Sequence, residues 1–541
     1  MVKAAQDKTE HLIMNAKART MDPALPRAEA VAIKNGRVAA VGSRDHCRAA
    51  LGARPQVIDL AGRLLLPGFT DAHLHYFDWA QSLARIPLGR AQDRAQALAM
   101  VAERAAAAPP GQWILGRGLE ESDWPEPVLP TLAELDAAAP ANPVLLFRRD
   151  MHLTLTNSAA LAVAGVTRDT ADPKLGRIGR DEAGEPNGRL YEKATYLALG
   201  RAPEHTEDQV LELMKAGLAR LHALGFTGVH DFRVTGRICG LPSFTAWQRL
   251  QEAGDLSLRV WMCVAGDRME DLVCLGLRSG FGGEMLKLGH LKFFSDGSLG
   301  ARTAWMLEPY NDAAAGGPMT PPEELAPAIL RAHANGLAVA VHAIGDRANR
   351  ELIRVMGQTL GNAPAGNAPA APHRIEHLQM LGDSDLEALA SLNLVGSVQP
   401  MHIVEDIGVM SLAVGERTAT AYRFKELLAR GVPLCFGSDA PVSEPDALGA
   451  IAAAVTRQTP EGLPEEGWRP AQRLSVEQAV FAQTMGPATA SGRGRELGSI
   501  SPGKFADLTA LDRDIFQIPP REIWQTKAVF TMVGGRVVFR R

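Results

Sequence analysis

Residues 64–80 read LLLPGFTDAHLHYFDWA, an apolar run that ends in two histidines separated by one residue. Side chains of a strand alternate between its two faces, so His73 and His75 are expected to point in the same direction. Two neutral imidazoles on one face are ligands that zinc and related divalent ions accept. Because a His-x-His pair is also compatible with a structural role, further ligands are needed before it predicts a metal centre.

Four more candidate ligands follow, each near the end of an apolar, strand-like run. They are Lys292 in LKFFSDG, His342 in LAVAVHAIG, His377 in RIEHLQM and Asp439 in CFGSDA. Each has a structural alternative when taken singly: a histidine satisfied inside a core, an aspartate that caps a turn, or a lysine whose charge reaches water. Six such side chains become a specific pattern only if one fold brings the strand ends together.

The middle of the chain has the pattern that would do so. Apolar strand-like runs alternate with helical runs rich in Ala, Leu, Glu and Arg, as in a parallel sheet with crossover helices. The candidate strands are LLLPGFTDAH, PVLLFRRDMH, GFTGVHDF, LRVWMCV, LGHLKFFSDG, LAVAVHAIG, HRIEHLQM, LVGSVQP and VPLCFGSDA. Eight of the nine would complete a (β/α)8 TIM-type barrel, and PVLLFRRDMH is interpreted as the extra strand. The C-terminal ends of barrel strands form one face, where active sites of this fold lie.

The two ends of the chain differ from the middle. Residues 1–66 and 495–541 contain short apolar runs separated by Gly turns, such as Asn35-Gly36, which predict strands and hairpins. We therefore predict an α/β protein with a barrel domain at 67–494 and a small β-sandwich domain built from both termini.

The stretch at about 76–222 is far longer than a βα connection of about 2–6 residues. We expect this insertion to fold as a cap that covers the mouth of the barrel and sets specificity.

Composition excludes several classes of partner. The 541 residues carry a net charge of −4 without a long basic run, which argues against nucleic acid. The five cysteines form no C-x-x-C pair, and no apolar run approaches the ~20 residues that cross a bilayer. The N-terminus also has no apolar leader segment. We predict a cytoplasmic protein with a small-molecule substrate and no membrane partner, and leave a homo-oligomer open.

The order His-x-His, Lys, His, His, Asp along an α/β chain resembles the amidohydrolase superfamily. The resemblance to its N-substituted formamide deformylase-like branch is carried by GFTDAHLH, LKFFSDGSLGARTA, VHAIGDRAN, RIEHLQM, SVQPMH, GSDAPV, LDAAAPANPVLLFRRDMHLTLTNSAAL and GSISPGKFADLTALDRD. It extends from about residue 10 to the end of the chain. It implies a (β/α)8 barrel, a β-sandwich from both termini and metal-dependent hydrolysis of a carbon–nitrogen or related bond.

By position, the resemblance implies two divalent metal ions, with zinc as the expected metal. His73, His75 and Asp439 would bind the first ion, and His342 and His377 the second. Lys292, converted by carbon dioxide to an anionic carbamate, would bridge the two ions. A hydroxide that bridges the metals would then attack an amide, formamide or carbamate carbonyl. Asp439 would act as general base and then as general acid.

Other residues are predicted from their place near strand ends. His152 is a second predicted catalytic residue, because its segment RRDMHLTLTN resembles the family's Asp-Gly-His segment. It is expected to reach either the oxyanion or the substrate carbonyl. Trp79, Trp124, Trp305 and His402 are predicted to contact substrate, and the aromatic members favour a substrate with a hydrophobic or aromatic group. Two alternatives stay open: an esterase or lactonase on the same metal site, and a non-catalytic scaffold that retains the fold. The intact ligand set argues against the scaffold.

Overall fold

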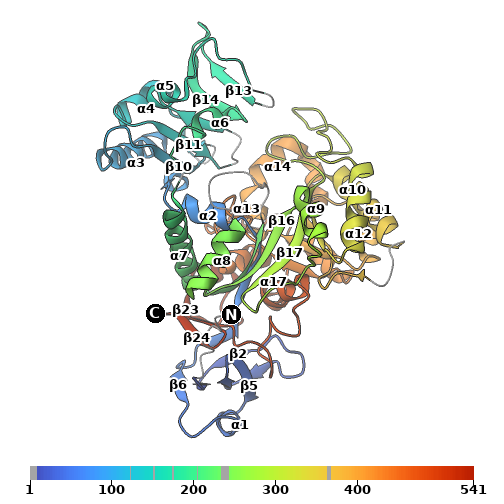
Figure 1. Cartoon of the computed structure of the whole chain (residues 1–541). Coiled ribbons are helices and arrows are strands. Elements are labelled where there is room, and N and C mark those ends of the chain that lie inside the picture. Colours follow the sequence, from blue (N-terminus) through green and yellow to red (C-terminus); the bar gives the residue numbers. More distant parts are fainter. Residues whose placement is uncertain are drawn as a thin grey trace. The chain divides into compact units, whose positions relative to one another are not determined.

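The structure is a computed structural model that describes residues 9–121, 124–149, 153–173, 176–203, 205–232, 243–361 and 367–541. Contacts between residues divide the chain into two compact units (Figure 1). The larger consists of Met1–Phe77 with Lys215–Arg541, and the smaller of Asp78–Met214. All six predicted metal ligands belong to the larger unit.

An eight-stranded sheet lies at the centre of the larger unit. Its strands, in order across the sheet, are β8 (Phe69–Leu74), β15 (Phe226–Phe232), β16 (Arg259–Ala265), β17 (Leu286–Phe294), β18 (Val339–Ala343), β19 (Arg374–His377), β20 (Val395–Val398) and β21 (Leu434–Phe436). All neighbouring pairs are parallel. The first and last strands meet through two backbone hydrogen bonds. The amide of Asp439 donates to the carbonyl of His73 at 2.6 Å, and the amide of His75 donates to the carbonyl of Ala440 at 2.7 Å. The sheet is thus a nearly closed barrel, and the predicted eight-stranded α/β barrel is confirmed.

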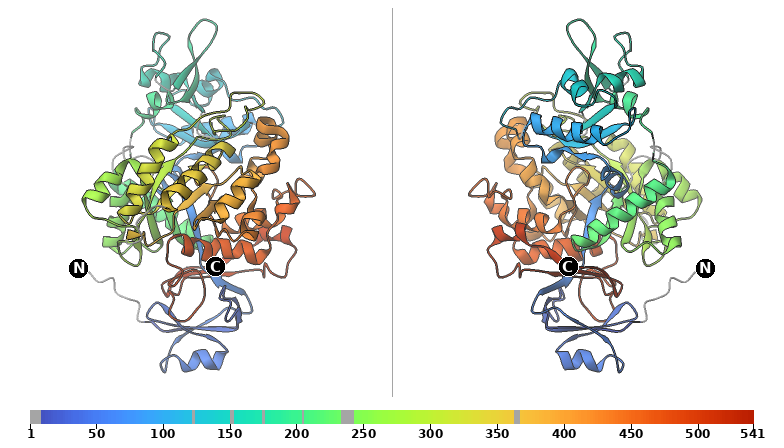
Figure 2. Two further views of the ribbon diagram at one scale, coloured as in Figure 1. Left: turned by 90° about the vertical axis from the view of Figure 1, so that its right-hand side faces the viewer. Right: turned by 90° about the vertical axis from the view of Figure 1, so that its left-hand side faces the viewer.

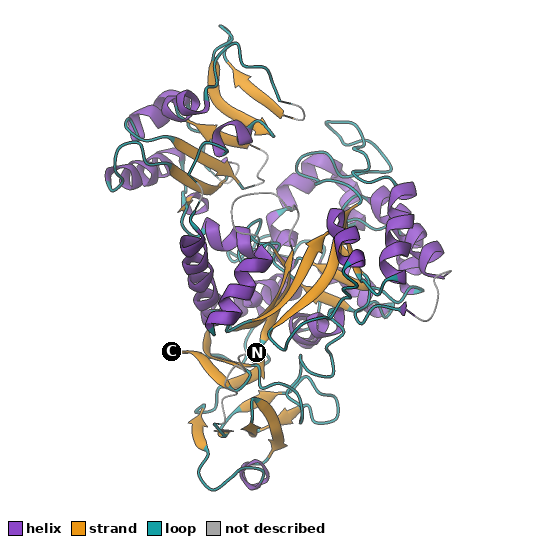
Figure 3. Ribbon diagram, in the orientation of Figure 1, coloured by secondary structure: helices purple, strands orange, loops and turns teal. Residues whose placement is uncertain are grey.

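Helices cover the outside of this sheet (Figure 3). They include α7 (Glu207–Ala223), α8 (Ser243–Ala253), α10 (Pro322–Ala334), α11 (Asp346–Gly361), α12 (Asp383–Ala390), α15 (Phe424–Ala429), α16 (Ala447–Thr456) and α17 (Val476–Ala490). Local sequence sets several of their starts: Pro322 occupies the first turn of α10, and Ser475 with Gln478 forms a capping box on α17. Because helices cover one face of each strand and the barrel interior the other, the strands are nearly continuous apolar runs.

Strands from both ends of the chain pair with one another. A four-stranded sheet has the order β5-β4-β1-β6, and a six-stranded sheet the order β24-β23-β22-β7-β2-β3. Their bounds are β1 (His11–Met14), β2 (Lys17–Arg19), β3 (Arg27–Ala28), β4 (Ala30–Lys34), β5 (Arg37–Gly42), β6 (Gln56–Asp59), β7 (Leu64–Pro67), β22 (Leu508–Leu511), β23 (Ala528–Val533) and β24 (Arg536–Arg540). Ile33 of the first sheet and Phe530 of the second belong to one buried apolar cluster. Figure 2 shows these N-terminal (blue) and C-terminal (dark red) strands side by side. Their separation as a β-sandwich domain stays a prediction.

The smaller unit has a sheet of its own, in the order β13-β14-β12-β11-β10-β9. Its elements are β9 (Ile86–Pro87), α3 (Arg94–Ala106), β10 (Ile114–Leu119), α4 (Leu132–Ala138), β11 (Val144–Arg148), β12 (Leu153–Thr156), α5 (Ser158–Ala164), β13 (Gly176–Arg180), β14 (Pro186–Glu192) and α6 (Thr195–Leu199). The ninth candidate strand is β11 of this sheet, so its exclusion from the barrel is correct. Leu88, Val101 and Leu146 are buried in a core within this unit. That the insertion covers the barrel mouth stays a prediction.

None of the helices in the described parts of the chain is long and apolar enough to cross a membrane.

Candidate metal centre

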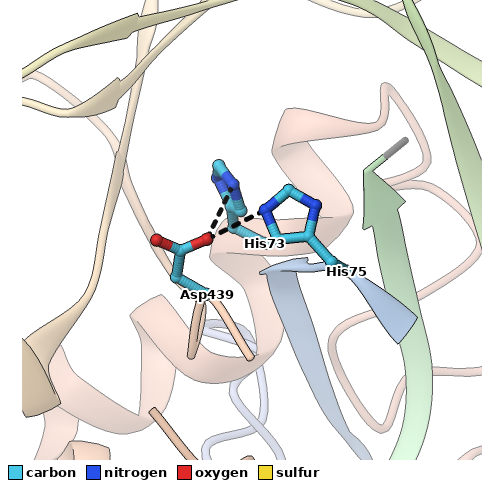
Figure 4. Close-up of side chains that lie close together, drawn as sticks. All are labelled: His73, His75 and Asp439. Atoms are coloured by element: carbon cyan, nitrogen blue, oxygen red, sulfur yellow. Dashed lines mark ion pairs between the residues drawn. The ribbon is translucent and has the colours of Figure 1, made fainter. Parts of the chain in front are cut away.

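His73, His75 and Asp439 converge at the C-terminal ends of β8 and β21 (Figure 4). Asp439 Oδ1 lies 3.4 Å from His73 Nε2 and 3.2 Å from His75 Nε2. Four-coordinate zinc, with bonds of about 2.0–2.1 Å, holds neighbouring ligand atoms about 3.3–3.4 Å apart. The three side chains therefore fit one divalent ion. Asp439 has a φ of 60°, a left-handed conformation that is unfavourable for a non-glycine residue and concentrated at functional sites.

The environment favours the protonation states that bind metal. Burial, assisted by the charge of Lys292, lowers the pKa of His73 to about 4, so its imidazole is neutral at pH 7. Burial opposes ionisation of Asp439, but His73, His75 and His377 in their cationic forms hold the pKa of this carboxyl well below its usual value, an effect that a divalent ion would supply beside the neutral rings. A neutral imidazole beside an ionised carboxylate is the state that a divalent ion requires.

Hydrogen bonds fix which nitrogen of each ring faces Asp439. His73 Nδ1 donates to Glu376 Oε2 at 2.5 Å, and His75 Nδ1 donates to the carbonyl of Phe232 at 2.8 Å. Since the Nδ1 atoms carry the protons, the Nε2 lone pairs are directed at the Asp439 side of the site. Such bonds from the far nitrogen are the usual way in which proteins orient metal-binding histidines.

Glu376 is in turn held by Arg374, a residue pair that the sequence analysis did not single out. Arg374 donates to both carboxylate oxygens of Glu376, at 2.7 and 2.9 Å, and both side chains are fully buried. Burial opposes ionisation of Glu376, but the guanidinium holds the pKa of the carboxyl well below its usual range. Arg374 also donates to Ser397 and to His230, so the pair belongs to a buried network across four strands. Arg374-x-Glu376 directly before a predicted ligand is the signal that sequence reasoning missed.

The other predicted ligands lie at the same end of the barrel. The ring centroid of His377 is 5.3 Å from that of His73 and 4.4 Å from that of His342. His342 Nε2 donates to the carbonyl of Gly297 at 3.0 Å. His377 Nδ1 donates to Gln399 Oε1 at 2.8 Å, which leaves its Nε2 lone pair available.

Lys292 is buried between aromatic rings in the same region. Its Nζ lies 5.2 Å from the ring centroid of Phe232, which stacks on His73, and 4.9 Å from that of Phe294. Burial lowers the pKa of Lys292 to about 8, so a larger share of the amine is neutral at pH 7 than in an exposed lysine. The structure thus brings all six predicted ligands together.

His402 joins this cluster from α13 (Pro400–Glu405). Candidate ligand atoms of His377, His402 and Asp439 all lie within 4.8 Å of one another, as do those of His73, His75 and Asp439. The ring of His402 is nearly parallel to that of His377, with centroids 6.5 Å apart. The predicted substrate contact is therefore placed next to predicted ligands.

The three tryptophans predicted to contact substrate differ in how deeply they are buried. Trp79 in α2 (Tyr76–Ser82) is fully buried, and Trp124 is 5% exposed with its Nε1 donating to the carbonyl of Ala91. Trp305 is partly exposed, with the guanidinium of Arg347 4.9 Å from its ring centroid. Their contact with substrate stays a prediction. His152 lies outside the described residues.

Buried carboxylates hold the loops around the site in place. Asp71 accepts hydrogen bonds from the amides of His73 and Ser438, at 3.1 and 3.0 Å, and so ties the two strand ends together. Asp296 accepts from the amides of Gly345 and Trp305, at 2.8 and 2.9 Å. Burial raises the pKa of Asp71 and of Asp296 to about 7. Both aspartates accept hydrogen bonds from backbone amides at or near predicted ligands, and so help to position those ligands.

Comparisons with known proteins agree with this architecture. The model of the amidohydrolase family matches residues 56–539. The chain is 32% identical to Protein LONG AFTER FAR-RED 3 of Arabidopsis thaliana, over 98% of this chain and 91% of that protein. It is 28% identical to the N-substituted formamide deformylase of Arthrobacter pascens, over 98% of each. The chain is also 28% identical in sequence to an uncharacterized metal-dependent hydrolase from Pyrococcus horikoshii OT3, whose crystal structure is known. It superimposes with a TM-score of 0.76 over 95% of this chain and 99% of that one.

Proposed function

Because the chain belongs to the amidohydrolase family and is a metal-dependent hydrolase of carbon–nitrogen bonds other than peptide bonds, we propose that its substrates are amides, formamides or carbamates. The observation that carries its metal-dependent chemistry is the placement of Asp439 Oδ1 3.2 and 3.4 Å from two imidazole nitrogens that face it. The full-length similarity to an N-substituted formamide deformylase supports this substrate class over an ester.

In this proposal, His73, His75 and Asp439 would hold one divalent ion, with zinc as the metal, and His342 and His377 would hold a second. When bound, such ions make water nucleophilic at neutral pH and polarise a carbonyl oxygen. Lys292, as a carbamate formed when the neutral amine bonds to the carbon of carbon dioxide and releases one proton, would supply anionic oxygen ligands to these ions. Its burial, which lowers the pKa of the amine to about 8, favours this reaction.

Asp439 is proposed to carry the proton as well as to bind metal, because it is ionised and next to the site where water is activated. Its carboxylate accepts a proton from water and returns it to the leaving nitrogen. Asp439→Asn should lower kcat by about 10²–10⁴-fold, with metal content measured in the same samples. Asp208→Asn, on the exposed surface of α7, is the control. Full turnover in an Asp439→Asn protein that keeps its metal would refute the proton-transfer role.

The preferred substrates are proposed to carry a hydrophobic or aromatic group. The partly exposed ring of Phe294 lies 5.2 Å from that of His342, so apolar surface adjoins the predicted ligands. Burying one aromatic group contributes about 1.5–3 kcal/mol, so an N-benzyl formamide should have a clearly higher kcat/KM than N-methylformamide. Equal values, or a preference for a dicarboxylate or phosphorylated compound, would contradict this. The corresponding benzyl ester tests the esterase alternative.

A further inference from the structure

We infer that His402 is a further protein ligand of the second metal position, beside His377 and His342, with Asp439 as a shared ligand. The inference rests on the proposed metal centre and adds to it a residue that the sequence places only as a substrate contact. It concerns the binding of the ion itself, so it can be tested without any substrate.

The first support is the state of the His402 side chain. It is 9% exposed, and its Nε2 has no hydrogen-bond partner among the residues that the structure describes. A buried polar atom without a partner is costly, and a bound ion or water is one of the explanations for such an atom in a native protein. A divalent ion on Nε2 would satisfy this nitrogen.

The second support is that His377 is prepared for the same ion. Gln399 Oε1 accepts the proton on His377 Nδ1, which directs the lone pair to Nε2. The two rings are almost parallel, at 9°, with centroids 6.5 Å apart. That separation is too wide for a hydrogen bond between the rings but leaves room for an atom between them.

The third support is the way in which one short segment serves both histidines. Gln399 precedes the first turn of α13, and His402 lies three residues later in that helix. The turn that leaves β20 therefore orients one candidate ligand and supplies the next. Candidate ligand atoms of His73, His75 and Asp439 also lie within 4.8 Å of one another, so Asp439 is common to two candidate ligand groups.

The test is metal binding by the full-length protein, stripped with a chelator and titrated with Co²⁺. We expect the wild type to bind two equivalents, while His402→Ala keeps one and binds the second at least tenfold more weakly. The visible absorption of bound Co²⁺ should change with the loss of a nitrogen ligand. His373→Ala is the matched control, because His373 is also a buried histidine but precedes β19, at the strand's other end from His377.

A second variant, His402→Gln, and thermal unfolding of all the metal-free proteins test whether a variant is still folded. Weaker Co²⁺ binding by a variant that unfolds at the temperature of the wild type reports a lost ligand. Two tight equivalents and an unchanged Co²⁺ spectrum in a folded His402→Ala protein would overturn the inference, as would a wild type that binds only one equivalent. Loss of hydrolysis with unaltered Co²⁺ binding would also overturn it and assign His402 to substrate. Failure of the wild type to hydrolyse amides, formamides or carbamates would instead count against the proposed function, since Co²⁺ binding does not involve substrate.

Discussion

Glu376 determines which nitrogen of His73 can bind a metal. Its carboxylate accepts the Nδ1 proton at 2.5 Å and is itself fixed by Arg374. In Glu376→Gln, the neutral amide would hold the ring less firmly and would leave the buried Arg374 without its counter-charge. We expect metal affinity to fall by about 10–100-fold, as measured by competition with a chromophoric chelator.

Glu477→Gln, at an exposed position of α17, is the control for this exchange. Unchanged affinity in a folded Glu376→Gln protein would show that the ring of His73 is oriented by its packing alone.

The sequence predicted the six candidate ligands but not this supporting pair, and the reason lies in the backbone. Strand alternation places Arg374 and Glu376 on one face of β19 and His377 on the other. In the structure, Glu376 bonds His73, and the ring of His377 is also 5.3 Å from that of His73. The φ of 74° at His377 interrupts the alternation at the end of the strand. Periodicity cannot reveal such a turn, so it could not place Glu376 at the site.

At the scale of elements, α7 carries a buried histidine that should make stability depend on pH. His222 Nδ1 donates to the carbonyl of Phe226, and its Nε2 accepts from the hydroxyl of Ser257, so the ring is neutral. Burial, with a smaller effect from the charge of Arg536, lowers the pKa of His222 to about 4. The unfolded state, with a pKa near 6.5, therefore binds the proton first as the pH falls.

This linkage should lower the free energy of unfolding as the pH falls from about 6.5 to about 4. The decrease should be roughly 2 kcal/mol at pH 5. In His222→Gln, the decrease in the free energy of unfolding between pH 7 and pH 5, measured by urea unfolding, should be smaller by that amount. Comparing the two pH values within each protein cancels any constant effect of the substitution. The same loss in both proteins would refute the assignment to His222.

Long apolar runs made the barrel strands predictable, whereas most strands of the smaller unit could not be predicted. Eight runs correspond to β8 and to β15–β21, because strands covered on both faces are continuously apolar. In the smaller unit, β9 has two residues, and β13 and β14 are glycine- and arginine-containing segments without an apolar run. Their pairing depends on tertiary contacts, which override weak local preference. Only β11, a compact VLLFR run, was recognised.

At the scale of the whole molecule, the larger unit depends on both ends of the chain. β22 pairs antiparallel with β7, and β7 leads directly into β8, which carries His73. Arg259 at the start of β16 donates to both carboxylate oxygens of Asp507, in the segment before β22. The terminal strands therefore support the ends of barrel strands that lead to the metal centre.

The division into two units predicts that metal binding and substrate choice can be separated. Residues 78–214 form one unit, and His73, His75, Lys292, His342, His377, His402 and Asp439 all lie in the other. Replacing residues 78–214 with the corresponding segment of a relative should therefore leave metal content unchanged. If the insertion sets specificity, as its length predicts, the ratio of kcat/KM for an N-benzyl and an N-methyl formamide should move toward that of the donor.

Metal analysis and the two kcat/KM values would be measured on the parent, the donor and the chimaera. A chimaera with full metal content and the parent's substrate ratio would place specificity in the larger unit, near Phe294 and Trp305. A folded chimaera that loses its metal would show that the smaller unit supports the centre directly. Because every candidate ligand comes from the larger unit, we expect neither result.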